Sequence, residues 1–173
     1  VEDQNHPYAA LLEETFDDEE EYSAFMGDFR SKANINIRLI AGIEPKLATT
    51  VIYQKFEYLF STYSGGSMRD QLDPNTGQLT QQSKAVIEFE GFNPPLNNLI
   101  HGLPPWALDE TNTNNPSFMD PNRVQIRNEI RSMLGDIASK VIAWNPLDVW
   151  LKFRRVTLME AFKYYWEYDG GRR

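Results

Sequence analysis

Two glutamates, Glu88 and Glu90, are the residues of this sequence whose type and spacing could do chemistry. In a β-strand, side chains two positions apart point to the same face, so both carboxylates would lie together. A pair of carboxylates can bind a hard cation or divide the roles of general acid and general base. His101 follows in the same part of the chain and could join such a site. The competing interpretation is that the two glutamates are the water-facing side of a half-buried strand, and we favour it.

The other motifs that bind cofactors or metals are missing from the sequence. It has no cysteine, which excludes disulfides and thiolate metal sites. It contains no glycine-rich phosphate loop and no nucleophile elbow. The segment from Asp73 to Gly77 shares a few positions with a calcium loop, but Pro74 and the glycine indicate a tight turn instead. We therefore predict no cofactor, no metal and no enzymatic activity.

The composition is that of a globular protein with an acidic surface. At 173 residues and 41% hydrophobic content, the chain is expected to form a single domain over residues 1–173. Its net charge of −8 argues against nucleic acid as a partner. No apolar run reaches the roughly 18–20 residues that a membrane-spanning helix needs, so no membrane span is predicted. We expect the protein in the cytoplasm or within a soluble assembly, such as a virion or an organellar complex.

The fold class predicted from the hydrophobic pattern is mainly α. Apolar residues at helical spacing predict helices over residues 7–63 and 121–169. Within the first range, residues 35–41 fit a strand as well as a helix, with a slight preference for the helix. The prediction is a small helical domain of three to four main helices, with a minor β-hairpin and a long proline-rich extended segment.

The last helix, expected from Asn145 to Tyr168, is apolar around more than half of its circumference. A helix of this kind needs neighbours on several sides. We therefore predict that it is the central helix of the core and that Leu151, Leu158 and Phe162 are buried.

Residues 67–120 are predicted to form the hairpin and then an extended arm. After the turn at Asp73, the sequence KAVIEFEGF alternates apolar and polar residues as a strand does. Five of the ten prolines then lie between Pro94 and Pro116, which argues against long regular structure. Large apolar residues are interleaved with these prolines, so we expect the arm to lie on another surface, that of its own helices or of another chain.

These patterns give a set of candidate partner-binding residues. The arm contributes large apolar anchors, the helix after Pro121 contributes arginines at every fourth position, and the last helix contributes an aromatic residue at its end. The arginines Arg123, Arg127 and Arg131, which we call the arginine ridge, are also typical of an ordinary solvent-facing helix surface. The aromatic residue could equally be part of the core. The candidates are Leu99, Ile100, Leu103, Trp106, Leu108, Arg123, Arg127, Arg131 and Trp166.

The function predicted from the sequence is that of a non-enzymatic structural or assembly subunit. Its arm would contact other protein subunits, either copies of itself or different chains. A viral particle or its tail machinery is one such assembly, and a large organellar complex is another. Two alternatives come from other classes: a small carboxylate-dependent enzyme, and a regulatory adaptor that binds a helix of its partner through the aromatic end.

Overall fold

The computed structural model describes residues 15, 18–64, 68, 71–109, 118–163 and 165–166. In these residues it has no β-strand and six α-helices, which confirms the mainly α class and shows that the predicted β-hairpin is wrong. The predicted helix over 7–16, most of the arm beyond 109 and the last helix beyond 166 lie outside the described residues. The helices are α2 (Glu19–Ile43), α3 (Pro45–Tyr63), α4 (Lys84–Gly102), α5 (Pro105–Leu108), α6 (Pro121–Ala143) and α7 (Val149–Ala161).

The contacts divide the chain into two compact units, residues 1–36 and 37–173. The described part of the first unit is the beginning of α2, where three acidic residues lie in the first turn and favour the positive end of the helix dipole. The rings of Phe25 and Phe29 stack there with their centroids 6.4 Å apart, and both remain more than half exposed. Residues 35–41 are helical, as the sequence slightly favoured. A single domain over the whole chain stays a prediction.

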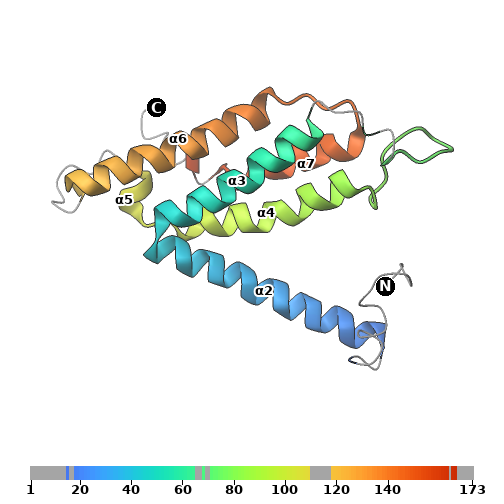
Figure 1. Ribbon diagram of the computed structural model, residues 1–173, viewed down its shortest axis with the longest axis horizontal. Coiled ribbons are helices and arrows are strands. Elements are labelled where there is room, and N and C mark those ends of the chain that lie inside the picture. The colour runs from blue at the N-terminus through green and yellow to red at the C-terminus, as the bar shows by residue number, and fades with distance from the viewer. Residues whose placement is uncertain are drawn as a thin grey trace. The chain divides into compact units, whose positions relative to one another are not determined.

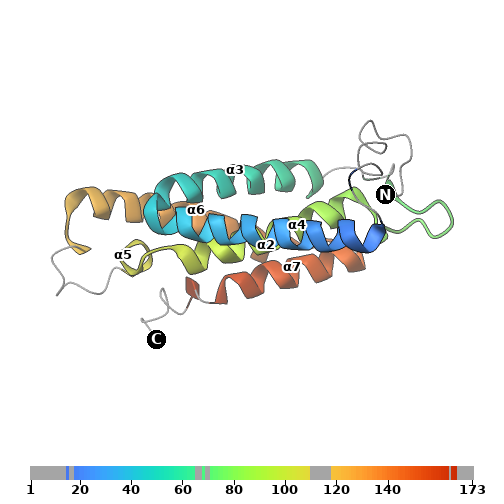
Figure 2. The same ribbon diagram turned by 90° about the horizontal axis from the view of Figure 1, so that it is seen from below.

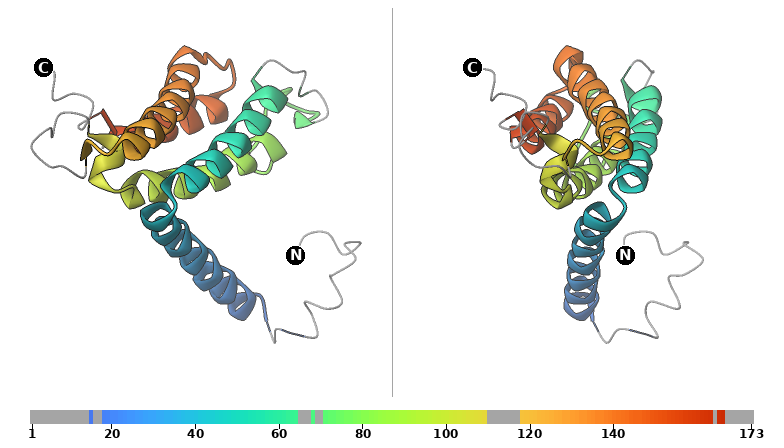
Figure 3. Two further views of the ribbon diagram at one scale, coloured as in Figure 1. Left: turned by 60° about the vertical axis from the view of Figure 1, so that its left-hand side comes forward. Right: turned by 90° about the vertical axis from the view of Figure 1, so that its left-hand side faces the viewer.

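The second unit contains two helical hairpins (Figures 1 and 2). Helices α3 and α4 run in opposite directions, and so do α6 and α7. Helix α3 packs against α6, and α4 packs against both α3 and α7. Figure 3 shows the same two hairpins from the side, one lying against the other. Pro45 and Pro121 each occupy a first helical turn, where no backbone N–H is needed, and the helix start predicted at residue 121 is confirmed.

Helix α4 replaces the strand predicted over residues 84–92 and the first part of the predicted extended arm. It is helical from Lys84 to Gly102 although Pro94 and Pro95 lie inside it. An interior proline destabilises a helix by about 3 kcal/mol. Burial of one whole side of α4 offsets this loss. The buried residues recur at helical spacing: Ala85, Val86, Phe89, Phe92, Leu96, Leu99 and Ile100.

The core is centred on α4 rather than on the last helix. The ring of Phe89 lies 4.8 Å from that of Trp144, and Phe92 lies 5.9 Å from Phe56 of α3. Helix α7 is only 13 residues long and covers one side of α4. Its prediction as the central helix is therefore wrong. The burial predicted for its three core residues is confirmed: Leu151, Leu158 and Phe162.

A polar cluster joins the outer helices α3 and α6. The Tyr53 hydroxyl donates a hydrogen bond to Asp136 (2.8 Å), and the Lys140 ammonium donates to both Asp136 and Glu57 (2.7 Å each). The hydrogen bond from Lys140 holds the pKa of Asp136 below its ordinary value of 3.8, and the Tyr53 hydroxyl adds to this effect. The hydrogen bonds that Lys140 donates to Asp136 and Glu57 raise the pKa of Lys140. The hydrogen bond that Tyr53 donates to Asp136 raises the pKa of Tyr53.

Replacing Asp136 with Asn should lower the free energy of unfolding at neutral pH and change it much less in acid. Because the pKa of Asp136 is lower in the folded protein, its charge stabilises the fold above the unfolded pKa, and this contribution is lost as the pH falls through the folded value. Urea unfolding should therefore show a constant difference between wild type and Asp136→Asn from about pH 5 to pH 8, which shrinks below about pH 4. Asp28→Asn, on an exposed part of α2, is the control. A difference that does not depend on pH would contradict the assignment.

One close approach of helices depends on a glycine. A Cβ atom at Gly102, the last residue of α4, would lie 2.8 Å from the Cα of Arg38 and 2.9 Å from the Cβ of Ala41. Real Cβ atoms are not found this close to backbone, so only glycine fits where α4 meets the last turns of α2. Gly91, in the middle of the same helix, has nothing within 4 Å of its Cβ position.

The substitution Gly102→Ala should lower the free energy of unfolding by about 1–3 kcal/mol, as overpacking does. Gly91→Ala should instead leave it unchanged or raise it by up to about 1 kcal/mol, since alanine is the better helix former. Both values come from urea unfolding of the same protein. Equal effects of the two substitutions would show that the close approach at Gly102 does not exist in solution.

Candidate protein-binding surface

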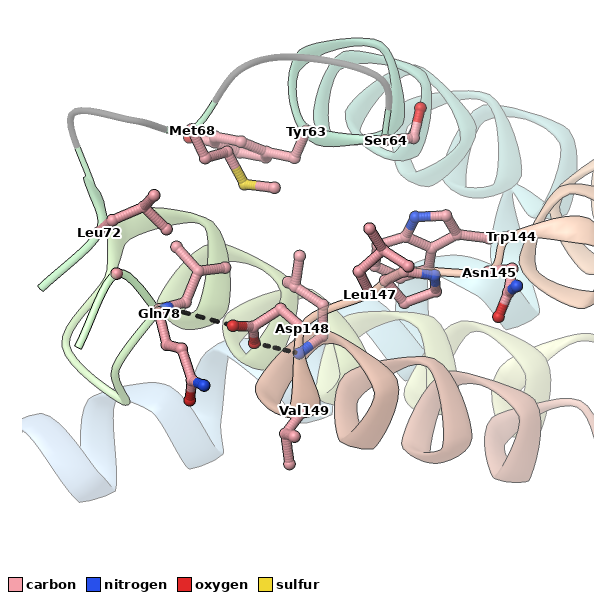
Figure 4. Close-up of a pocket in the computed structure, with 14 residues that line it drawn as sticks. Tyr63, Ser64, Met68, Leu72, Gln78, Trp144, Asn145, Leu147, Asp148 and Val149 are labelled. Carbon is pink, nitrogen blue, oxygen red and sulfur yellow. Dashed lines mark hydrogen bonds between the residues drawn. The ribbon is translucent and has the colours of Figure 1, made fainter.

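The connection from α3 to α4 and the connection from α6 to α7 meet at one end of the two hairpins, and Asp148 joins them. One of its carboxylate oxygens accepts hydrogen bonds from the backbone N–H groups of Trp150 (2.8 Å) and Leu151 (3.4 Å), which caps α7. The other accepts from the N–H of Leu79, at 3.1 Å. Figure 4 shows this carboxylate between the two connections. A single side chain thus starts α7 and holds the α3–α4 connection in place.

The α3–α4 connection contains the tight turn that the sequence predicted. The carboxylate of Asp73 accepts hydrogen bonds from the N–H groups of Asn75 (2.8 Å) and Thr76 (2.9 Å), and Gly77 has the positive φ of 65° that glycine tolerates. These N–H groups hold the pKa of Asp73 below its ordinary value. The turn leads into α4 rather than into a strand, so only the turn of the predicted hairpin is confirmed.

Between the two connections lies an open, largely apolar pocket of about 530 Å³, within the size range of natural binding sites. Tyr63 and Met68 line it on one side, and Trp144 and Leu147 face them from the other (Figure 4). Among the described residues of the lining, Asp148 and the Tyr63 phenol are the ionisable groups, and the Asp148 carboxylate already accepts hydrogen bonds from three N–H groups. The described part of the pocket therefore suits an apolar group and offers no free carboxylate.

An exposed apolar stripe runs along α7 from the edge of this pocket. Val149 lines the pocket and is 70% exposed. Phe153 and Val156 follow it at spacings of four and three residues, so the three side chains lie on one side of the helix. Phe153 is 54% exposed and Val156 is 53% exposed. We call these three residues the α7 stripe.

The two edges of the α7 stripe differ in charge. On one edge lie Lys152 and Arg155, and the guanidinium of Arg155 donates to the backbone carbonyls of Val141 (3.0 Å) and Ile142 (2.7 Å) at the end of α6. On the other edge Arg154 forms an ion pair with Glu90 of α4. The first edge is therefore basic, and the second is neutralised.

The apolar residues predicted to bind a partner lie in the protein's own core. Their side chains are 0–6% exposed, so they have almost no surface to offer another chain. Trp106 is half-buried beneath the guanidinium of Arg123, which lies 5.1 Å from its ring centroid. The prediction of an extended, partner-binding arm is therefore not supported between residues 93 and 109. The four buried residues are Leu99, Ile100, Leu103 and Leu108.

The arginine ridge is not a free surface either. Arg127, 7% exposed, donates to the carbonyls of Asp109 (3.3 Å) and Phe118 (3.4 Å) and so holds the residues on both sides of the undescribed segment. Arg123 covers a tryptophan, and the carbonyl of Arg131 accepts a hydrogen bond from the hydroxyl of Tyr165. Trp166 packs on Phe162, with ring centroids 6.0 Å apart, and is half-buried. A role for these residues in partner binding stays a prediction.

The structure does not bring Glu88 and Glu90 together, because two positions along a helix point to nearly opposite sides. Glu88 is paired with Lys55 (3.7 Å) and Lys84 (3.9 Å), whereas Glu90 is paired with Arg154. The strand that would have placed both carboxylates on one face is wrong. No group of three or more potential metal ligands is found among the described residues.

Comparison with known proteins identifies the family of the chain, which the geometry of the pocket and the stripe does not. The family model of the Exportin-5 family matches residues 1–168. The chain belongs to the Exportin-5 family. No curated protein and no solved structure matches it. For a member of a family named for export, the surfaces that could contact other proteins become the features of interest.

In this exportin-family chain, neither the pocket nor the α7 stripe is predicted by the sequence patterns. The spacing of Val149, Phe153 and Val156 is visible in the sequence, where it contributes to the broad apolar circumference from which neighbours on several sides are predicted. Leu147, which lies within the range predicted for the last helix, is 90% exposed. The pocket had no signal in the sequence, because its walls come from segments separated by about 65–90 positions that meet only through folding.

Replacing Asp148 with Ala should lower the free energy of unfolding by about 1–3 kcal/mol, since it removes a helix cap and leaves the N–H of Leu79 without its acceptor. Asp148→Asn keeps one acceptor oxygen and should lose less. Hydrogen exchange at Leu79 and Trp150 should rise in the Ala variant. Unchanged exchange at Leu79 would show that the two connections are not joined through this side chain.

Proposed function

We propose that the chain is a protein-binding part of an exportin and acts in transport between nucleus and cytoplasm. The observation that carries this proposal is the match to the Exportin-5 family over residues 1–168. The helical architecture supports it, since helical hairpins that pack side by side bury one side of each helix and leave another available.

The exposed apolar residues support a protein-binding role. Exposed apolar patches of this kind are typical of protein interfaces. Helix α3 exposes one stripe and α7 exposes another, and within each stripe the side chains lie on one side of the helix. These residues are 52–70% exposed: Leu47, Val51 and Tyr58 on α3, and Val149, Phe153 and Val156 on α7.

The assembly function predicted from the sequence is retained only in its general form, as binding to other proteins. Neither a viral particle nor an oligomer is supported, and the family relationship favours transport instead. No helix among the described residues combines the length and the apolar character that crossing a membrane requires. The exclusion of nucleic acid as a partner and the absence of enzymatic activity both stay predictions.

The proposal is tested by depleting the protein rapidly in its own cells and measuring how other proteins divide between nucleus and cytoplasm. A defined set should accumulate in the nucleus, and wild-type protein should restore its distribution. A variant with Val51→Ser, Tyr58→Ser, Phe153→Ser and Val156→Ser should restore it less well. A variant with Ser132→Ala and Ser139→Ala, at exposed polar positions of α6, should restore it fully. No change in any distribution on depletion would contradict the proposed function.

A further inference from the structure

The α7 stripe has the length of a contact with one helix. From Val149 to Val156 the helix rises by about 10 Å, at 1.5 Å per residue. Three apolar side chains with the spacing i, i+4, i+7 match the apolar side of a second amphipathic helix, which carries residues at the same spacing. Leu147, 90% exposed, extends the apolar surface beyond the beginning of α7 and lines the pocket.

The charges around the stripe specify which amphipathic helix would fit. Lys152 is exposed on one edge, and no ion pair involves it among the described residues. Arg155 lies on the same edge, fixed by its hydrogen bonds to the carbonyls of α6. On the opposite edge, Glu90 neutralises Arg154. The stripe ends at Val156, and Glu160 lies one turn beyond it on the same side of the helix. A helix that lies on the stripe thus meets positive charge along one of its sides.

We propose that the α7 stripe binds an amphipathic helix of a partner protein whose apolar side is bordered by acidic residues. The apolar side covers Val149, Phe153 and Val156, and the acidic residues lie along Lys152 and Arg155. Complementary charge on that edge sets the position of the partner helix and rejects helices with basic borders. This inference rests on the proposed function and specifies the chemistry of the partner.

The stripe on α3 lacks this charge pattern, which is why the proposal is confined to α7. The lysines next to the α3 stripe are already paired within the chain. Lys46 lies 2.5 Å from Glu129 of α6, and Lys55 lies 3.7 Å from Glu88 of α4. Neutral edges give a partner helix no preferred charge. The two stripes differ in charge but are similarly exposed, so α3 serves as the control for α7. Val51 and Tyr58 of α3 are 54% and 52% exposed. Val156 and Phe153 of α7 are 53% and 54% exposed.

The test uses a synthetic amphipathic peptide of about 18 residues, long enough to form a helix, with leucines at i, i+4 and i+7 and glutamates along their borders. A second peptide has lysines in place of the glutamates, and a third has the sequence of the first in scrambled order. Binding to the full chain is measured by fluorescence anisotropy at low salt. The glutamate peptide should bind most tightly. The methyl NMR signals of Val149 and Val156 should shift, and those of Leu47 and Val51 should not.

Matched substitutions locate the binding site. Phe153→Ser should weaken binding of the glutamate peptide about tenfold, as the loss of an apolar anchor does, and Tyr58→Ser should leave it unchanged. Lys152→Glu should weaken binding of the glutamate peptide about threefold and strengthen binding of the lysine peptide, the size expected for an exposed charge pair. All these residues are exposed, so the variants should fold, and circular dichroism checks this.

Four results would overturn the inference: equal binding of the scrambled peptide, equal effects of Phe153→Ser and Tyr58→Ser, no change of preference in Lys152→Glu, or self-association of the chain that Phe153→Ser abolishes. The last result would mean that a second copy covers the stripe. Failure of peptide binding in a protein whose depletion still changes nuclear distributions would overturn this inference alone. Peptide binding without any change on depletion would overturn the proposed function alone.

Discussion

The burial of α4 between α3 and α7 is the constraint on which the rest of the structure depends. This helix buries seven residues although it contains two consecutive prolines, and its Phe89 packs on Trp144 at the point where the second hairpin turns. Since Trp144 also lines the pocket, the same packing that builds the core forms part of the pocket wall. A change that weakened α4 would therefore disturb both hairpins and the surface between their connections together.

Polar interactions fix how the two hairpins meet. Between α3 and α6, the Asp136 carboxylate accepts hydrogen bonds from Tyr53 and Lys140 and so joins the two helices. At the connections, Asp148 caps α7 and holds Leu79. Both carboxylates join segments that are far apart in the sequence, and both satisfy donors that would otherwise lose their partners on folding. The exposed apolar stripes are thereby held on rigid helices, which favours binding because little entropy is lost when a partner docks.

The family relationship and the surface chemistry address different questions. Membership of the Exportin-5 family supports the proposed role in transport. The α7 stripe, with Lys152 and Arg155 on one edge and the neutralised Arg154 on the other, indicates the kind of surface with which a partner would have to be complementary. Folding pairs Glu88 with two lysines and Glu90 with Arg154, so the carboxylate pair found in the sequence does not remain as a free site. Of the arginines, Arg127 is engaged by two backbone carbonyls, and a role for them in partner binding stays a prediction.

The sequence by itself determined the features that depend on neighbouring residues. Helix starts at Pro45 and Pro121, the turn at Asp73 and the burial of Leu158 follow from short-range rules on capping, turns and helical spacing. Only the tertiary structure decided that residues 84–102 form a helix. Their apolar residues fit alternation over a few positions and helical spacing over the whole segment, and their prolines disfavour a helix locally. Contacts with α3 and α7 outweigh that preference, because burying one side of a long helix stabilises it by more than two prolines destabilise it.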